Sequence, residues 1–172
     1  MAHEPLSYSE ADYDLLIRSK TASLLSGACE VGALRAPPRE REVLRRFGDL
    51  LGMAFQIVDD LLDYTEEEAV TGKPSGNDLR EHKVTLPLIH ALKHFGPEAR
   101  REVRTLMATP EPSDEQIGQV VARVAEAGGL DYARERAHRL AARAEQELEA
   151  LPASPARETL RDSLSYVLDR KR

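Results

Sequence analysis

The sequence predicts an all-α protein, and three observations support this fold class. Apolar residues recur at intervals of three and four along most of the 172 residues, which is the spacing of amphipathic helices. No stretch alternates apolar and polar residues convincingly, and the β-branched residues that favour strands are sparse. Proline, glycine and helix-capping residues divide the chain at helix-length intervals. Because no repeat or linker interrupts the pattern, residues 1–172 are expected to form one all-α domain.

The first predicted helix lies near the start of the chain. Ser7 and Glu10 have the spacing of a capping box, and Leu6 is placed for a hydrophobic staple. Helical spacing then continues to about Leu34, where the prolines at 37–38 end it. We therefore expect one helix between these signals.

The middle of the chain predicts two helices around a loop. The first covers about residues 39–64. Residues 65–78, TEEEAVTGKPSGND, are rich in glycine, proline and turn-forming residues and are expected to be irregular. A helix over about residues 79–94 follows, with Pro87 inside it as a kink.

The last third carries three further boundary signals. Gly96-Pro97 breaks the chain, and Ser113 with Gln116 caps a new helix. The glycine pair at 128–129 ends that helix, and a charged amphipathic stretch follows. The pair at 154–155, Ser-Pro, starts the final helix.

Composition excludes several classes of protein. The net charge is −6, from 30 acidic and 24 basic residues, which argues against nucleic acid as the main partner. The single cysteine, Cys29, cannot form an internal disulfide and suits a reducing compartment. No uncharged run approaches the roughly 20 residues of a membrane span. The first residues lack the pattern of a signal peptide, so a cytoplasmic location is expected.

The stretch FQIVDDLLDY places Asp59, Asp60 and Asp63 among apolar residues. At 100° per residue, the three aspartates fall within about 60° of Gln56 on a helix, and apolar residues fill the remaining arc. A solvent-facing helix shows the reverse balance, with a limited apolar face. The apolar arc comprises Leu50, Leu51, Met53, Ala54, Phe55, Ile57, Val58, Leu61 and Leu62.

Buried carboxylates without a counter-charge are costly, so this acidic stripe is expected to line a wet cavity that holds cations. Carboxylates without histidine or cysteine select a hard cation, and Mg²⁺ typically binds through one or two carboxylates, waters and substrate phosphates. Asp59 and Asp63, one helical turn apart, suit such a complex. The alternative is a solvated acidic face, which a lone DDxxD motif does not exclude.

Three lysines could hold a phosphate-bearing substrate. Lys20 has Leu16 and Leu24 as helical neighbours, so it projects from an apolar side; a lysine covering the edge of the core is the alternative. Lys73 lies in the glycine-containing loop and could close over a phosphate, although such loops often only connect helices. Lys83 follows one turn into the next predicted helix. No Walker-type P-loop is present.

The order of these pieces resembles the C-terminal half of a trans-type isoprenyl diphosphate synthase of the polyprenyl synthetase family. The stretches that carry the resemblance are RSKTASLLSGACEVGAL, GMAFQIVDDLLDY and TGKPSGNDLREHKVTLPLIHAL. The resemblance implies an antiparallel helical bundle, half of an isoprenoid-synthase-type fold. It also implies a reaction in which Mg²⁺ assists ionisation of an allylic diphosphate. The double bond of isopentenyl diphosphate then attacks, and a proton is lost.

The resemblance assigns roles to residues of the acidic stripe. Asp59, Asp60 and Asp63 match the second aspartate-rich motif of the family. Asp59 would bind Mg²⁺ directly, and the other two aspartates would support it through metal or water. Phe55 and Gln56 match the FQ pair before the motif, with Gln56 facing the allylic substrate.

The resemblance also assigns the basic residues. Lys20 and Thr21 match the KT pair, and Lys73 matches the TGK lysine; both lysines would hold the allylic diphosphate. Lys83 matches a further lysine near that diphosphate, and Asp78 the acid of the GxD turn. Lys20 and Lys73 join Asp59 as the expected catalytic residues, because metal and lysines stabilise charge on the leaving diphosphate.

The family's first aspartate-rich motif and its isopentenyl diphosphate site have no counterpart in this sequence. The lone chain is therefore expected to be inactive. Our main hypothesis is one subunit of a split, hetero-oligomeric prenyltransferase whose N-terminal half comes from a second chain. A non-catalytic regulatory subunit of a full-length synthase and an inactive fragment are the alternatives.

Overall fold

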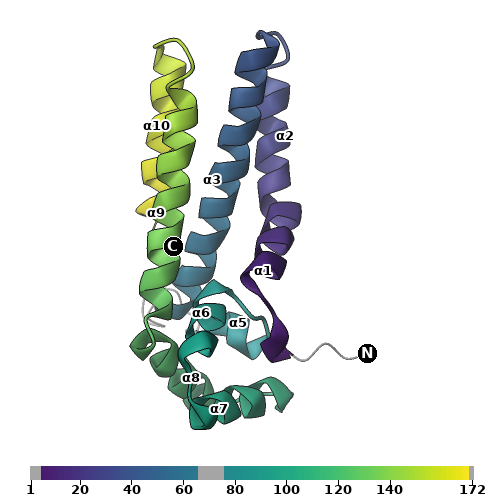
Figure 1. Cartoon of the computed structure of the whole chain (residues 1–172), viewed down its shortest axis with the longest axis vertical. Coiled ribbons are helices and arrows are strands. Elements are labelled where there is room, and N and C mark those ends of the chain that lie inside the picture. Colours follow the sequence, from purple (N-terminus) through teal and green to yellow (C-terminus); the bar gives the residue numbers. More distant parts are fainter. Residues whose placement is uncertain (1–4, 66–75, 171–172) are drawn as a thin grey trace. The chain divides into compact units, whose positions relative to one another are not determined.

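The computed structural model describes residues 5–65 and 76–170. These residues form helices and no strand, which confirms the predicted all-α class (Figure 1). In chain order the elements are a 3₁₀ turn (Pro5–Ser7), α1 (Glu10–Ile17), a π-helical turn (Arg18–Ala22), α2 (Ser23–Gly32), α3 (Pro38–Thr65), α5 (Asn77–Arg80), α6 (Leu86–His94), α7 (Pro97–Ala108), α8 (Asp114–Glu126), α9 (Gly129–Leu148) and α10 (Pro155–Leu168).

The chain divides into two compact units. Unit 1 comprises the described parts of Met1–Tyr13 and Asp59–Arg134, and unit 2 comprises Asp14–Val58 with the described part of Glu135–Lys171. Helix α3 contributes its first part to unit 2 and its last turns to unit 1. That residues 1–172 act as a single domain stays a prediction.

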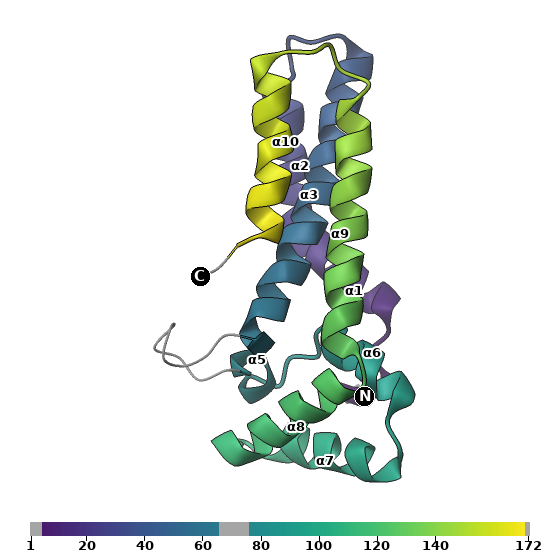
Figure 2. The same cartoon turned by 90° about the vertical axis from the view of Figure 1, so that its left-hand side faces the viewer.

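Unit 2 is built from two helical hairpins. Helices α2 and α3 form one, α9 and α10 form the other, and these helices run side by side in both views (Figures 1 and 2). Their apolar faces enclose a core in which a fully buried Leu or Phe contributes roughly 1.5–3 kcal/mol. This core contains Phe47, Leu50, Ala141, Ala144, Leu148 and Leu164.

The backbone of α3 lies close to those of α2 and the preceding π-helical turn at two glycines, Gly48 and Gly52. A Cβ at position 48 would lie 2.6 Å from the carbonyl oxygen of Leu25. A Cβ at position 52 would lie 2.5 Å from the Cα of Ala22. Glycines four residues apart share one helix face and leave room for a second backbone. The GDLLG sequence therefore sets the distance between these two helices.

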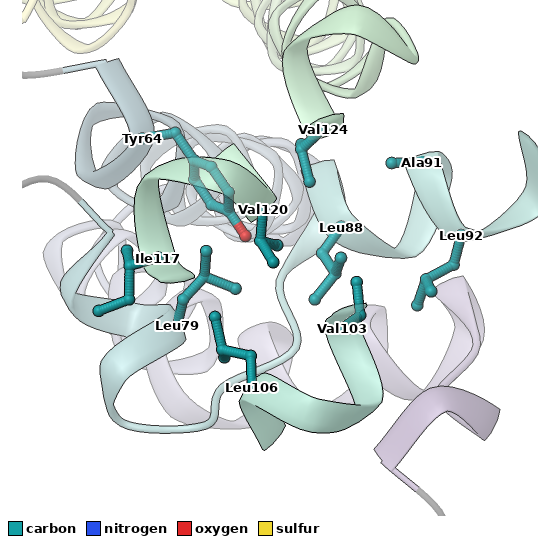
Figure 3. Packing of buried hydrophobic residues seen from close by; sticks show 10 residues of the cluster. All are labelled: Tyr64, Leu79, Leu88, Ala91, Leu92, Val103, Leu106, Ile117, Val120 and Val124. Carbon is teal, nitrogen blue, oxygen red and sulfur yellow. The ribbon is translucent and has the colours of Figure 1, made fainter. Parts of the chain in front are cut away.

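Unit 1 surrounds a second core, which joins the end of α3 to α5, α6, α7 and α8 (Figure 3). The ring of Tyr64 lies among aliphatic side chains from these four helices. The buried members are Tyr64, Leu79, Leu88, Ala91, Leu92, Val103, Leu106, Ile117, Val120 and Val124. This core fixes the last turns of α3, where the aspartates lie.

The first helix is capped two residues later than predicted. Ser9, not Ser7, precedes α1: its hydroxyl accepts the backbone N–H of Asp12 at 3.2 Å, and its own N–H reaches the Asp12 carboxylate at 3.0 Å. Both serines have an acid three residues on, so sequence spacing did not distinguish them. Glu10 is instead engaged by Lys93 and by the Tyr132 hydroxyl.

The predicted kink at Pro87 is also wrong. The chain leaves the short helix α5 through His82, whose φ of 58° is left-handed, and continues as α6 only from Leu86. Thr85 is extended and precedes α6, so Pro87 stands in the first turn, where its missing N–H costs no helical hydrogen bond.

Several other boundary signals are confirmed. The predicted irregular stretch over residues 65–78 lies largely outside the described residues, and α5 already begins within it, at Asn77. Ser113 and Gln116 form a capping box at the start of α8, and the Ser154 hydroxyl caps α10. The predicted helix over residues 39–64 is α3, one residue longer at each end. Within the described residues, no helix has the length and apolar character needed to cross a lipid bilayer.

Candidate functional site

The polar stripe of α3 is largely enclosed by protein. Gln56 and Asp60 are only 7% and 6% exposed, and Asp59 and Asp63 are half-buried. The apolar arc around them is buried or half-buried along its whole length, as predicted. The alternative expectation was a fully solvated acidic face, and the burial of these residues contradicts it.

Thr21, on the π-helical turn, fixes the side chain of Gln56. The amide oxygen of Gln56 accepts a hydrogen bond from the Thr21 hydroxyl at 2.8 Å. The close approach at Gly52 brings the two backbones together one helical turn before this bond. The structure thus joins two predicted substrate-binding residues that are 35 positions apart in sequence.

Lys20 lies on the same π-helical turn, and its side chain is exposed. Such turns are rare and occur frequently at functional sites. Its helical neighbours Leu16 and Leu24 are 49% and 74% exposed. The apolar side from which Lys20 was predicted to project therefore faces outward in the described chain.

Asp60 is positioned by a residue that the sequence did not single out. The hydroxyl of Tyr13 donates to Asp60 Oδ2 at 2.7 Å, and the Tyr13 side chain is only 1% exposed. A hydrogen bond to an ionised acceptor is stronger than a neutral one, and burial adds to the cost of losing it. No local pattern links these residues, which are 47 positions apart.

Asp63 holds the start of α5 against the end of α3. Its Oδ2 accepts the backbone N–H of Asp78 at 2.8 Å, and its carbonyl accepts that of Gly76 at 2.7 Å. Gly76 has a left-handed φ of 77°, which suits glycine. Asp63 therefore has a positioning role besides its predicted metal role. Lys73 lies outside the described residues.

Lys83 is directed toward acids rather than toward solvent alone. Its ammonium contacts the carboxylates of Glu81 at 2.7 Å and Asp78 at 3.0 Å, and these bonds raise the pKa of Lys83. Because Lys83 is 50% exposed, these ion pairs add little to the free energy of unfolding. They do hold the ammonium group beside the two carboxylates.

The buried side chain of Tyr64 lies near carboxylates at the end of α3. Burial raises the pKa of its hydroxyl, which bonds with Thr85 Oγ1 at 3.2 Å. The carboxylates of Asp78, Asp60 and Asp63 raise this pKa further. A cation at the acidic stripe would be favoured by the same carboxylates.

The carboxylates of the acidic stripe suit a Mg²⁺ ion that is also bound by waters and by the phosphates of a substrate. Within residues 5–65 and 76–170, no three His, Cys, Asp or Glu side chains form a cluster that could hold a metal ion. Mg²⁺ is usually held by one or two carboxylates together with waters and substrate phosphates. Asp59 and Asp63, at helical spacing i and i+4, supply two carboxylates on one face.

Tyr13→Phe is expected to destabilise the chain by about 1–3 kcal/mol, because it removes a donor from a buried carboxylate. Urea unfolding followed by circular dichroism at neutral pH measures this loss. Tyr166→Phe, at a tyrosine that is 74% exposed, is the control and should change nothing. Equal stability of both variants would mean that the Tyr13–Asp60 bond contributes nothing net.

A sequence model of the polyprenyl synthetase family matches residues 1–124. The chain is 43% identical over 169 residues to an all-trans-nonaprenyl-diphosphate synthase of Rhodobacter capsulatus, covering 98% of this chain and 51% of the relative. A decaprenyl diphosphate synthase structure from Rhodobacter capsulatus superposes with a TM-score of 0.89 at 37% identity, covering 97% of this chain and 52% of the other.

A polyprenyl synthase structure from Caulobacter crescentus CB15, complexed with calcium and isoprenyl diphosphate, superposes equally well. Its TM-score is 0.89 at 33% identity, covering 96% of this chain and 51% of the other. The chain spans about half the length of the curated relatives that it matches. The fold, the family match and these identities agree, and the chain belongs to the polyprenyl synthetase family.

Proposed function

We propose that this chain supplies the metal and allylic-diphosphate half of a prenyltransferase active site. The observation that carries the proposal is the enclosed polar stripe of α3, in which Gln56 and Asp60 are buried and hydrogen-bonded. A helix that only packs against its neighbours does not need this stripe, because burial of charge is costly. The Caulobacter crescentus relative, which is complexed with calcium and isoprenyl diphosphate, supports the same chemistry.

In this proposal the acidic residues hold Mg²⁺, which when bound neutralises charge on the departing diphosphate. Asp59 binds the metal directly. Asp60 and Asp63 support it and remain oriented by Tyr13 and by the backbone of Asp78.

The basic and polar residues hold the allylic diphosphate. Lys20, Lys73 and Lys83 contact the phosphate oxygens, and their charges stabilise the diphosphate as its bond to the allylic carbon breaks. Thr21 and Gln56 flank the allylic group and keep each other in place through their hydrogen bond. Isopentenyl diphosphate, the second substrate, binds in the part of the enzyme that this chain does not provide.

The proposal includes a partner chain. The chain covers about half of each relative that it matches, and it contains one aspartate-rich DDxxD motif rather than two. We therefore propose a hetero-oligomeric enzyme in which a second polypeptide completes the site. The chain alone should be inactive. A cytoplasmic location and the lack of a nucleic acid partner stay predictions.

The test is a comparison of the tagged chain recovered from its own cells with the recombinant chain alone. Both samples receive labelled isopentenyl diphosphate, an allylic diphosphate and Mg²⁺. We expect turnover in the recovered sample only, with a copurifying smaller chain that matches the missing half. A copurifying full-length synthase would instead indicate a regulatory subunit. Inactivity of both samples would favour an inactive fragment.

A further inference from the structure

The outer side of α2 is apolar. Leu24 and Val31 are 74% and 64% exposed, and the small residue Ala28 between them is exposed as well. They follow at intervals of four and three residues, so they share one side of the helix. Leu34 continues the apolar surface at 60% exposure and Leu16 precedes it at 49%. We call Leu16, Leu24, Ala28, Val31 and Leu34 the α2 face.

The α2 face differs from the solvent-facing helix α9 of the same unit in its content of charged residues. Between residues 23 and 34 only Glu30 is charged, and it is half-buried. Helix α9 shows the opposite pattern, since its exposed positions in unit 2 include Glu135, Arg139 and Arg143. A helix side without charge is typical of a buried helix, and an exposed apolar patch of this kind marks an interface.

The length of the relatives indicates what covers the α2 face. They match nearly all of this chain but only about half of their own length, so a comparable length of chain has no counterpart here. Among the described residues, the other exposed large hydrophobic residues are Leu15, at 67% on α1, and Tyr166, at 74% on α10. The α2 face thus holds four of the six exposed large hydrophobic residues of the described chain.

We propose that the α2 face is the docking surface for the second polypeptide, and that its occupant is a helical segment equivalent to the half of the relatives that this chain lacks. This inference rests on the proposed function and names where its partner binds. Lys20 lies between Leu16 and Leu24 on the π-helical turn, so a bound partner lies beside a substrate-binding lysine. Docking then excludes water around that lysine and strengthens its attraction for phosphate.

The test measures binding without substrate. The probe is the part of the Rhodobacter capsulatus nonaprenyl synthase that this chain does not cover, produced as a separate polypeptide. Isothermal titration calorimetry compares the wild-type chain, Leu24→Asp/Val31→Asp and the control Tyr166→Asp. The control residue has the same 74% exposure as Leu24. Circular dichroism verifies that each variant keeps its helices.

We expect the wild type and Tyr166→Asp to bind equally. The double variant should bind at least about 100-fold more weakly, because it loses two apolar contacts and buries two carboxylates. Equal binding of the double variant would overturn the proposal, as would failure of the wild type to bind the probe. Self-association of the wild type that the double variant abolishes would assign the face to a second copy. A complex that forms as expected but shows no turnover would contradict the proposed function and leave the docking surface intact.

Discussion

Asp59→Ala is expected to lower Mg²⁺-dependent turnover of the active complex by about 100- to 1,000-fold or more, the range for loss of one electrostatic stabiliser of a transition state. Asp59 is half-buried at the end of α3, where the neighbouring carboxylates already create a negative potential. Removal of one acid relieves mutual repulsion, so stability should be kept. Loss of turnover with an unchanged unfolding midpoint would identify a chemical role.

Two companion variants make the result for Asp59 specific. Asp162→Ala removes an exposed carboxylate from α10 and should leave turnover unchanged. Asp63→Asn keeps an oxygen that can accept the N–H of Asp78 but removes the negative charge. If Asp63 serves the metal, Asp63→Asn loses turnover and keeps stability; if it only anchors the chain, turnover survives. Unchanged turnover in Asp59→Ala would refute the metal assignment.

Most of the fold could be predicted because its signals are local. Helical periodicity and caps placed α3, α8 and α10 within a residue or two. The signals failed where two local patterns compete. Ser7 and Ser9 both have an acid three residues on, and Pro87 suits either a kink or a first helical turn.

The acidic stripe of α3 could be predicted from periodicity, but the residues that hydrogen-bond to it could not. Its residues share one helix, so their common face follows from helix geometry alone. The Tyr13–Asp60 and Thr21–Gln56 bonds join residues 47 and 35 positions apart, and no local rule predicts such pairs. The π-helical turn at Lys20 also carries no sequence signature. The GDLLG spacing was the one available signal for close packing.

Gly48→Ala/Gly52→Ala is expected to destabilise unit 2 by roughly 2–6 kcal/mol, since overpacking costs about 1–3 kcal/mol at each site. Alanine favours a helix by about 1 kcal/mol over glycine, so propensity alone predicts the opposite sign. The added Cβ atoms would lie 2.6 Å and 2.5 Å from backbone atoms of Leu25 and Ala22, which cannot move without separating the helices. Urea unfolding of the lone chain measures the difference.

Gly27→Ala/Gly32→Ala is the matched control for this prediction. Both glycines belong to α2, and a Cβ at either position meets nothing within 4 Å. The control should be stabilised by about 0.5–1 kcal/mol per site, because it gains helix propensity without a clash. The two double variants therefore differ in sign. If Gly48→Ala/Gly52→Ala were also stabilised, the close approach would be wrong, and with it the packing that places Thr21 against Gln56.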